Sequence, residues 1–429
     1  MNFIFSKVRP ILVFLFWGTF IALLAGCGKN KSDDPDAQIR FVHLAPETGS
    51  LSVRVDDDDC CVASGITYKG AGSIVNVKSL SRRLRVSDSS GVLLDQTLSL
   101  DANKKELVLF YGGKSSLAIG LLKNDMLEPA SGKSRVRISS NAVGLGSYDV
   151  YFSLSTEDYH NQEPKVSSAS STTLDVDKGT YTIRFTTPGS KEVLFQMPPR
   201  ALDEKGLYNL VTYNEGSSLL PNAFWYVQDS ADPPEFLTNA VSRIRVVNAA
   251  QNVQTANFTV VGGSRLFAGI PFAGVTSYAV VPSGQGSYVF TDAITGALYS
   301  FSATLSGGHD YTALLSPQDA GGQLLPIVVP DKTLPPSAGK VRVRVLNGSL
   351  YDSLALSLSY MQVTSPAGAR TTSDYVEVSS GTGTPVTITQ GSSAVPILST
   401  TQDLTSGYTY SFVLAGSNSV VKLTIGQDK

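Results

Sequence analysis

Charged residues are scarce in this chain of 429 residues, and positive and negative charges nearly balance. Asp, Glu, Lys and Arg make up 16% of the residues, and the formal net charge is −2. Proteins that bind nucleic acids present a strongly basic surface, so this function class is excluded. The 42% hydrophobic content also excludes a disordered chain, and the low charge excludes a long coiled coil.

Histidines and catalytic motifs are equally scarce. The three histidines, His43, His160 and His309, fall in three different copies of the repeat described below. The chain has no GxSxG, HExxH, GxxxxGK(S/T) or GxGxxG motif, the patterns of hydrolase, zinc-peptidase and nucleotide sites. A catalytic or zinc site would need such side chains brought together across domains. We therefore predict no enzyme activity and no cofactor.

One long apolar run is present, and it lies at the N-terminus. It extends from Pro10 to Leu24 after a short cationic segment and ends in Leu24-Ala25-Gly26-Cys27. The run is shorter than the roughly 20 residues of a membrane-spanning helix and has the features of a secretory signal. Cys27 after Leu24, Ala25 and Gly26 resembles the bacterial lipobox, in which the Cys receives lipid. The alternatives are an ordinary signal peptide, or an anchor helix with a chance Cys.

A lipobox implies a signal peptide over 1–26 and attachment of the mature chain to a membrane through lipid on Cys27. Stable anchoring needs more than one acyl chain, and bacterial lipoproteins are multiply acylated. The polar segment 27–38 reads as a flexible tether. We expect a lipid-anchored protein of the bacterial cell envelope, at the outer membrane, on the periplasmic side or at the cell surface.

A short pattern, apolar-Arg-apolar followed by a polar residue, occurs four times. Its central arginines are 97, 108 and 99 residues apart, and a similar series of predicted strands follows each one. Near-regular spacing with a common layout indicates tandem repeats. The arginines are Arg40, Arg137, Arg245 and Arg344.

The segments between these patterns predict strands and turns rather than helices. Ser and Thr supply 87 residues and Gly another 38, a composition that favours strands and tight turns. About seven short strands in about 95 residues are typical of an antiparallel, immunoglobulin-like β-sandwich. The fold class is therefore all-β, a string of tandem sandwiches joined by polar, Pro-containing linkers. We place the four repeats at 39–127, 134–228, 242–330 and 340–429.

The opening of the first repeat resembles a known bacterial repeat family, called domain of unknown function four-three-nine-seven. The segment IRFVHLAPETGSLSVRVD, residues 39–56, matches its opening in His43, Pro46 and Asp56. The third repeat matches in Arg245 and Asn248, and the second and fourth depart further. The resemblance implies a secreted or surface protein, often a lipoprotein, and assigns no functional residues.

We expect the arginine and the polar residue of each pattern to have structural roles. The apolar neighbours of each arginine point into the core by alternation, so the arginines are expected on the outer face of the sheet or at an edge. His43, Asn248 and Asn347 stand at strand ends, where we expect them to bond the backbone of a turn.

An acidic run, Asp56-Asp57-Asp58-Asp59, follows the predicted strand 51–55. Adjacent carboxylates repel one another, so a solvated hairpin tip is the favoured interpretation. The alternative is a calcium site, because clustered carboxylates are calcium ligands, although the spacing and Gly of an EF-hand loop are missing.

Cys60 and Cys61 follow the acidic run. If Cys27 carries lipid, no further thiol is left in the chain to pair with them. Adjacent cysteines form only a strained disulfide, so free thiols, a vicinal disulfide and a link between two molecules all remain open.

Phe224-Trp225-Tyr226 holds the single Trp of the mature chain. Alternation along a strand would bury some of these rings in the core and leave others at a domain junction. The alternative is a glycan site at Trp225, because aromatic rings stack on sugars.

Together these observations predict a non-catalytic envelope lipoprotein whose tandem sandwiches serve in binding or scaffolding, as an adhesin or a spacer. The expected partner besides the membrane is a protein or a polysaccharide. The alternative function is a glycan-binding module of an envelope uptake system.

Overall fold

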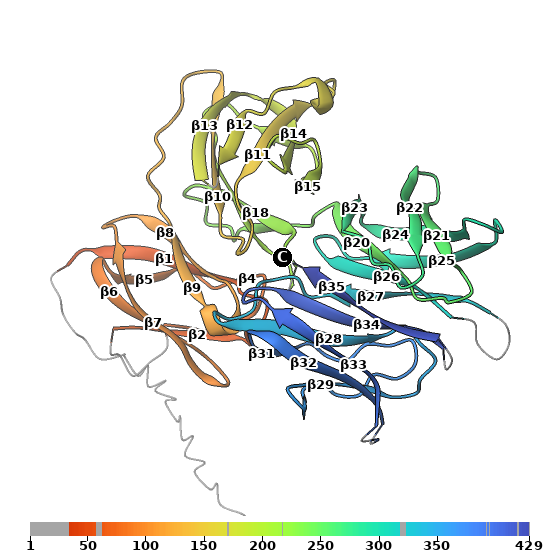
Figure 1. The fold of residues 1–429 in the computed structure, drawn as a ribbon. Coiled ribbons are helices and arrows are strands. Elements are labelled where there is room, and N and C mark those ends of the chain that lie inside the picture. The colour runs from red at the N-terminus through yellow and green to blue at the C-terminus, as the bar shows by residue number, and fades with distance from the viewer. Residues whose placement is uncertain are drawn as a thin grey trace, which may run out of the picture.

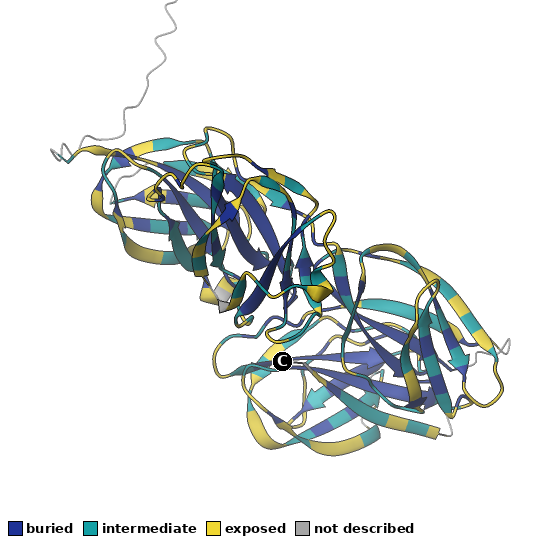
Figure 2. Cartoon of the chain, turned by 90° about the horizontal axis from the view of Figure 1, so that it is seen from above, coloured by how far each residue is buried: buried dark blue, intermediate teal, exposed yellow. Residues whose placement is uncertain are grey.

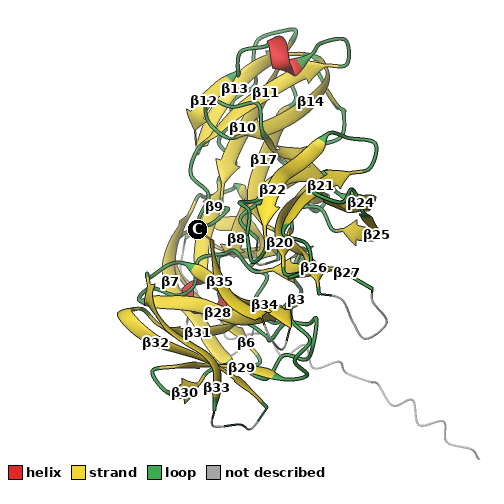
Figure 3. Ribbon diagram, turned by 45° about the vertical axis from the view of Figure 1, so that its right-hand side comes forward, coloured by secondary structure: helices red, strands yellow, loops and turns green. Residues whose placement is uncertain are grey.

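The structure is a computed structural model that describes residues 34–56, 62–169, 171–216, 218–317, 323–391, 393, 395–417 and 420–428. The signal peptide, the lipobox with Cys27, residues 57–61 and most of the tether lie outside the described residues. The described chain is built from strands, with two short 3₁₀ helices, η1 (Lys114–Ser116) and η2 (Tyr159–Asn161) (Figure 3). Within it, no helix has the length and hydropathy needed to cross a membrane.

The strands form eight sheets that pack in pairs as four β-sandwiches, numbered here in chain order (Figure 1). Sandwich 1 contains β1 (Asp36–Leu44), β2 (Leu51–Val55), β3 (Ala63–Ile66), β4 (Gly70–Ala71), β5 (Val75–Lys78), β6 (Leu80–Asp88), β7 (Gly91–Leu100), β8 (Lys105–Tyr111) and β9 (Ala118–Leu122). Sandwich 2 contains β10 (Lys133–Ser140), β11 (Tyr148–Leu154), β12 (Val166–Ala169), β13 (Ser171–Asp177), β14 (Gly179–Thr186), β15 (Val193–Gln196), β16 (Arg200–Leu202), β17 (Leu207–Asn214), β18 (Pro221–Val227) and β19 (Glu235–Leu237).

The second half of the chain repeats this arrangement. Sandwich 3 contains β20 (Val241–Asn248), β21 (Thr255–Val260), β22 (Arg265–Pro271), β23 (Ala279–Pro282), β24 (Gly284–Asp292), β25 (Leu298–Leu305), β26 (Asp310–Ser316) and β27 (Leu325–Asp331). Sandwich 4 contains β28 (Lys340–Asn347), β29 (Leu354–Leu358), β30 (Met361–Gln362), β31 (Val376–Ser379), β32 (Gly381–Gln390), β33 (Pro396–Leu404), β34 (Thr409–Ser417) and β35 (Val420–Asp428).

All four sandwiches share one strand order. The first sheet of sandwich 3 reads β23-β20-β26-β27 and its second sheet reads β22-β21-β24-β25, and the other sandwiches follow the same plan. The all-β class of tandem sandwiches is confirmed. The order differs from the immunoglobulin one, in which the first strand pairs with the second, because here the first strand lies inside its sheet.

One pairing in each sandwich is parallel, where the sequence predicted antiparallel strands throughout. The first strand runs parallel to a late strand in the pairs β1–β8, β10–β17, β20–β26 and β28–β34. A parallel pair needs a long crossover connection, and here the strands of the second sheet supply it. All other strand pairs in the described residues are antiparallel.

Alternation along the first strand separates core from outer face, as predicted. In β28, Val341, Val343 and Val345 are fully buried in the core of sandwich 4, while Arg342 and Arg344 point the other way. Each sandwich has one such apolar core between its two sheets.

The outer face of each first sheet is covered by another sandwich, so the sandwiches do not form a string. The first sheets of sandwiches 1 and 2 pack face to face, and so do those of sandwiches 3 and 4. We call these contacts the first seam and the second seam. Figure 2 shows buried strands running through both halves of the molecule.

The first seam is filled by large side chains. Tyr213, Phe224 and Tyr226 of sandwich 2 lie against aliphatic side chains of β1, β8 and β9. Arg40 reaches across the seam and donates hydrogen bonds to the carbonyl oxygens of Ala231, at 2.7 Å, and Asp232.

The second seam combines small apolar residues with a buried charge cluster. Ala249 and Ala415 pack among aliphatic side chains, and the Gly416 amide donates to the Ala249 carbonyl at 2.9 Å. Arg245 of sandwich 3 and Arg344 of sandwich 4 both contact Asp331. All three side chains are at most 3% exposed.

The two pairs also touch each other. The Ser218 hydroxyl of sandwich 2 donates to the Asp310 carboxylate of sandwich 3 at 2.9 Å. Arg342 of sandwich 4 lies 3.4 Å from the Glu47 carboxylate of sandwich 1. These contacts make the described chain one packed assembly of four sandwiches.

The arginines of the repeated pattern were expected on the outer face of the sheet or at an edge, and the seams change their surroundings. They do lie on the outer face of their sheets, but Arg40, Arg245 and Arg344 are 7%, 2% and 1% exposed. The partner sandwich covers this face, so the guanidinium groups are buried rather than solvated.

Two segments expected to be polar connections contribute to packing. The segment 27–38 was expected to be a tether, yet β1 begins at Asp36, and Ala37 belongs to the core of sandwich 1. In the linker after 228, β19 pairs with β18 and carries Phe236 into the first seam. In both cases pairing of the backbone with a neighbouring strand orders a segment that looks polar.

Candidate functional site

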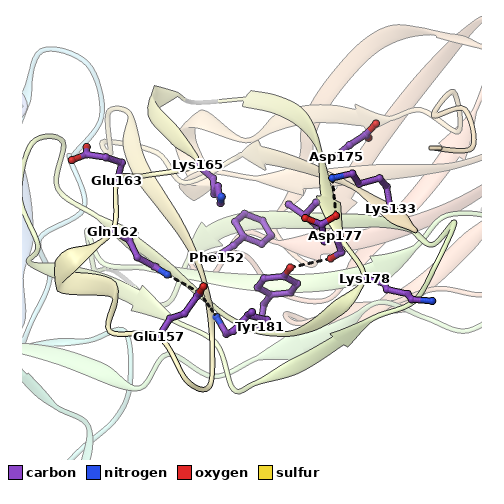
Figure 4. Close-up of a pocket in the computed structure, with 12 residues that line it drawn as sticks. Lys133, Phe152, Glu157, Gln162, Glu163, Lys165, Asp175, Asp177, Lys178 and Tyr181 are labelled. Carbon is purple, nitrogen blue, oxygen red and sulfur yellow. Dashed lines mark hydrogen bonds and ion pairs between the residues drawn. The ribbon is translucent and has the colours of Figure 1, made fainter. Parts of the chain in front are cut away.

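The main candidate site is a pocket of about 550 Å³ at one end of sandwich 2 (Figure 4). It opens beside β13 and the connection from β11 to β12. Its inner wall is apolar, formed by Phe152, Val176 and Tyr181, which also belong to the core of sandwich 2. Its rim is charged and carries Lys133, Glu157, Glu163, Lys165, Asp175, Asp177 and Lys178.

The connection from β11 to β12, Ser155–Lys165, builds one wall of this pocket. The Glu157 carboxylate accepts hydrogen bonds from the Leu154 amide at 2.9 Å and from the Gln162 side chain at 2.7 Å. Asp158 caps η2 by accepting from the His160 amide at 3.0 Å. These short-range bonds, together with η2, fix the loop.

The same loop is fastened to the second sheet from outside. The Lys191 ammonium donates to the Tyr159 carbonyl at 3.2 Å, and the Arg184 guanidinium lies 4.5 Å from the centre of the Tyr159 ring. Such a cation over an aromatic face is attracted by the ring. The pocket wall is therefore held on a rigid scaffold, the usual arrangement of a binding loop.

One side of the rim is an ion pair. The Lys133 ammonium lies 2.7 Å from the Asp177 carboxylate, and this contact lowers the pKa of Asp177 and raises that of Lys133. The Tyr181 hydroxyl donates to the Asp177 carbonyl at 3.0 Å. Partial burial is the main reason that the pKa of Tyr181 is raised.

The other side of the rim holds charges with open bonding capacity. Among the described residues, the side chains of Glu163 and Lys165 form no ion pair or hydrogen bond. A ligand with an apolar part and charged ends would place its apolar part against Phe152 and Tyr181. Its charged ends would lie at Glu163 and Lys165. The described residues hold no group of three or more His, Cys, Asp or Glu side chains suited to a metal ion.

The sites predicted from sequence do not gather around this pocket. Leu24, Ala25, Gly26 and Cys27 lie outside the described residues, as do Asp57, Asp58 and Asp59. Asp56 is described, at the end of β2, and its carboxylate accepts from the Arg83 amide at 3.1 Å and lies 3.5 Å from Arg82. One of the four calcium candidates therefore already bonds the neighbouring strand.

Trp225 lies in the core of sandwich 2. It is 4% exposed, and its ring centre is 4.9 Å from that of Tyr208. Its neighbours Phe224 and Tyr226 point the other way, into the first seam. The division of these rings between core and junction is confirmed, and the buried Trp225 ring does not present a face to a sugar.

The polar residue of the repeated pattern bonds turns, as predicted. Asn248 donates to the Val253 carbonyl at 2.8 Å, and Asn347 donates to the Tyr351 carbonyl at 2.7 Å. The His43 ring lies 3.0 Å from the Gly49 carbonyl and accepts from the Ala45 amide at 3.2 Å. Burial is the main cause of the lowered pKa of His43.

The pocket itself was missed by sequence reasoning, although a signal was present. The connection between the second and third strands has eleven residues in sandwich 2, at Ser155–Lys165, but four in sandwich 3 and two in sandwich 4. Counting loop lengths between aligned repeats would have marked this segment.

The comparison with protein families decides the classification. The family model described as Domain of unknown function (DUF4397) matches residues 37–151 and 242–358, more than half of the chain. This chain belongs to the DUF4397 family. Each match covers one whole sandwich and continues to β11 of sandwich 2 or β29 of sandwich 4. The DUF4397 resemblance of the first and third openings is thereby confirmed.

Other comparisons are more distant. No curated protein matches the chain. The Bacillus anthracis TIE protein is 11% identical over 89% of this chain and 69% of its own, with a TM-score of 0.15. The Streptococcal ancillary pilin is 11% identical over 67% of this chain and 99% of its own, with a TM-score of 0.16. Similarity this low supports no argument about function.

Proposed function

We propose that this DUF4397 protein is a non-catalytic, lipid-anchored protein of the bacterial cell envelope that binds a protein partner through the pocket of sandwich 2. The observation that carries the proposal is the pocket wall Ser155–Lys165, which is long and fixed by side-chain bonds. Two seams and the contacts between the pairs hold the sandwiches together, which favours a binding platform over an extended spacer.

The pocket chemistry suits a peptide segment. An apolar side chain of such a segment would fill the space against Phe152 and Tyr181. Charged groups next to it would meet Lys165 and Glu163, which form no ion pair among the described residues. Because the rim carries both signs, it favours a ligand with neighbouring groups of opposite charge.

Selection of phage-displayed linear peptides on the purified mature protein tests the site. We expect enriched peptides with an aromatic or long aliphatic residue flanked by opposite charges. Their affinity should fall at least tenfold in Lys165→Glu, which reverses a rim charge without touching the core. Lys104→Glu, an exposed change in sandwich 1, is the matched control. Peptides that bind all three proteins equally would place the site elsewhere.

Fractionation of cells tests the anchoring. The wild-type protein should partition with membranes and incorporate labelled palmitate. A Cys27→Ser variant should lose the label and leave the membrane fraction. Membrane attachment that survives Cys27→Ser would contradict the lipid anchor, and protease treatment of intact cells would separate surface display from a periplasmic position.

A further inference from the structure

The outer face of the second sheet of sandwich 4 carries a row of uncharged polar side chains. This sheet, β30-β29-β32-β33, lies at one end of the molecule (Figure 3). Gln362 faces Ser357, Ser357 faces Thr387, and Thr387 faces Ser399. One row therefore crosses all four strands, with about 4.8 Å between neighbours.

The row lies on the side of the sheet away from the core. Leu356 and Leu358, on either side of Ser357, belong to the core of sandwich 4, and so do Val386 and Ile388 beside Thr387. Because side chains alternate along a strand, Ser357 and Thr387 point outward. No seam covers this face in the described chain, since both seams use first sheets.

An exposed aromatic ring stands at the end of this row. Tyr360 is 85% exposed, in the two-residue connection between β29 and β30. Ser359 and Tyr360 both have positive φ, at 48° and 68°. This conformation is uncommon for a bulky residue and strained without Gly or Asn. Residues held in sparsely populated backbone conformations cluster at active sites and ligand-binding sites.

The row and the ring line one shallow hollow with a volume of about 430 Å³. It is lined by Ser357, Tyr360, Gln362, Thr387, Thr389 and Ser399 among others, and none of its described lining residues is charged. The equivalent row of sandwich 1 is charged, because Arg54 faces Arg85 and Arg85 faces Asp95. The absence of charge therefore distinguishes this face of sandwich 4 from its counterpart.

We propose that this face of sandwich 4 binds a neutral polysaccharide. Hydroxyl and amide groups both donate and accept hydrogen bonds, which matches the hydroxyl groups of a sugar. The exposed Tyr360 ring offers an apolar face for a pyranose ring, and its hydroxyl offers a further bond. A charged ligand would lose hydration here without gaining a counter-charge. The site is separate from the peptide pocket of sandwich 2.

A glycan array with neutral and acidic polysaccharides, followed by titration calorimetry with the best neutral oligosaccharide, tests the proposal. We expect binding to neutral chains only. Tyr360→Ala should weaken it at least tenfold, and Thr387→Val should weaken it severalfold by removing one hydroxyl at nearly constant shape. Val261→Ala changes an exposed residue at the equivalent connection of sandwich 3 and serves as the control.

Each contrary result has a defined meaning. No binding at millimolar concentrations of neutral oligosaccharides would overturn the proposal, and so would binding that survives Tyr360→Ala. Equal binding of acidic glycans would overturn the neutral selectivity. Lys165→Glu should leave glycan binding unchanged, so the failure of this site and the failure of the peptide pocket are distinguishable.

Discussion

The two seams fill the same space between first sheets with different chemistry. In the first seam Arg40 bonds backbone carbonyls, and aromatic rings of sandwich 2 pack against aliphatic side chains of sandwich 1. In the second seam Arg245 and Arg344 meet on Asp331, and the apolar contact comes from small and aliphatic residues. One position of the repeat thus serves both a largely apolar interface and an ionic one.

The residue beside each arginine on the neighbouring strand explains the difference. Arg40 faces Leu107, whereas Arg245 faces Thr312 and Arg344 faces Ser411. The Thr312 hydroxyl accepts from Arg245 at 2.8 Å, and the Ser411 hydroxyl accepts from Arg344 at 3.0 Å. Hydroxyl neighbours allow two guanidinium groups to be buried together, because they satisfy donors that the single carboxylate cannot reach.

Asp331 is the centre of the second seam. Its carboxylate also accepts from the Thr312 hydroxyl at 2.7 Å and from the Tyr278 hydroxyl at 2.5 Å. Burial opposes ionisation of this group, but the charges of Arg344 and Arg245 and these hydrogen bonds outweigh it and lower its pKa. The contribution of Asp331 to stability is therefore present above the ordinary pKa of Asp, and it is lost as pH falls through the lowered value.

We expect the largest loss of stability from Asp331→Ala. It leaves two buried guanidinium groups without their carboxylate, which typically costs about 3–5 kcal/mol. Urea unfolding at pH 7 measures the loss, and Asp95→Ala is the control, because Asp95 pairs with Arg83 on the exposed surface, where ion pairs contribute little to stability. A loss no larger than that of the control would show that the cluster does not hold the second seam.

Leu109→Ala tests the first seam, with a smaller expected loss of about 2–3 kcal/mol from a lost apolar contact and a residual cavity. Leu109 is 2% exposed and lies in the first seam. Its effect should be the same at pH 7 and in acid, whereas the effect of Asp331→Ala should shrink in acid as the wild-type carboxylate becomes protonated. A Leu109→Ala effect that also shrinks on acidification would remove the distinction between the seams.

The sequence predicted the parts of this fold that depend on local pattern. Alternation in β28 placed the valines in the core, and the Phe224-Trp225-Tyr226 run was correctly divided between core and junction. The burial of Arg245 and Arg344 was not predicted, because alternation tells only which face a residue takes. Whether that face meets water or another sandwich depends on contacts between sandwiches, such as that of Arg245 with Ser411, 166 positions apart.

The candidate sites illustrate the same limit. The acidic run, the pocket wall Ser155–Lys165 and the turn of Ser359 and Tyr360 all occupy the connection between the second and third strands of a sandwich. The acidic run has a conspicuous composition, whereas the compositions of the other two segments are ordinary. The length of the Ser155–Lys165 connection can be read from aligned repeats, but loop fixation, backbone conformation and exposure are seen only in the folded structure.

A third expected effect concerns a tyrosine contact that recurs in three of the sandwiches, at the start of the strand that pairs with the first strand. We call this position the corner. Tyr208, Tyr311 and Tyr410 each accept a hydrogen bond at the hydroxyl from the amide five residues earlier, at 2.8–2.9 Å. Tyr410→Phe removes this acceptor without changing the ring and should cost about 1 kcal/mol. The change lies inside one sandwich, so it should add to Asp331→Ala within about 0.5 kcal/mol. Marked non-additivity in urea unfolding would show that the corner and the second seam act as one unit.

Sandwich 1 places Glu106 at this corner instead of Tyr, and here we expect the smallest effect. The Glu106 carboxylate accepts from the Asp101 amide at 3.2 Å, and its other oxygen is buried without a hydrogen bond among the described residues. Burial is the main cause of its raised pKa, so the folded state holds this proton more tightly than the unfolded state does. Stability should therefore fall as pH rises from the ordinary Glu value through the raised one.

Glu106→Gln keeps a carbonyl acceptor for the Asp101 amide and removes the charge. The variant should equal or exceed the wild type in stability at pH 7 and lose its advantage below the ordinary pKa of Glu, where the wild-type group is protonated in both states. Thermal unfolding between pH 4 and pH 7 measures this difference. A variant that is less stable at pH 7 would show that the ionised carboxylate has a favourable partner, and the corner of sandwich 1 would then be an ionic contact like the second seam.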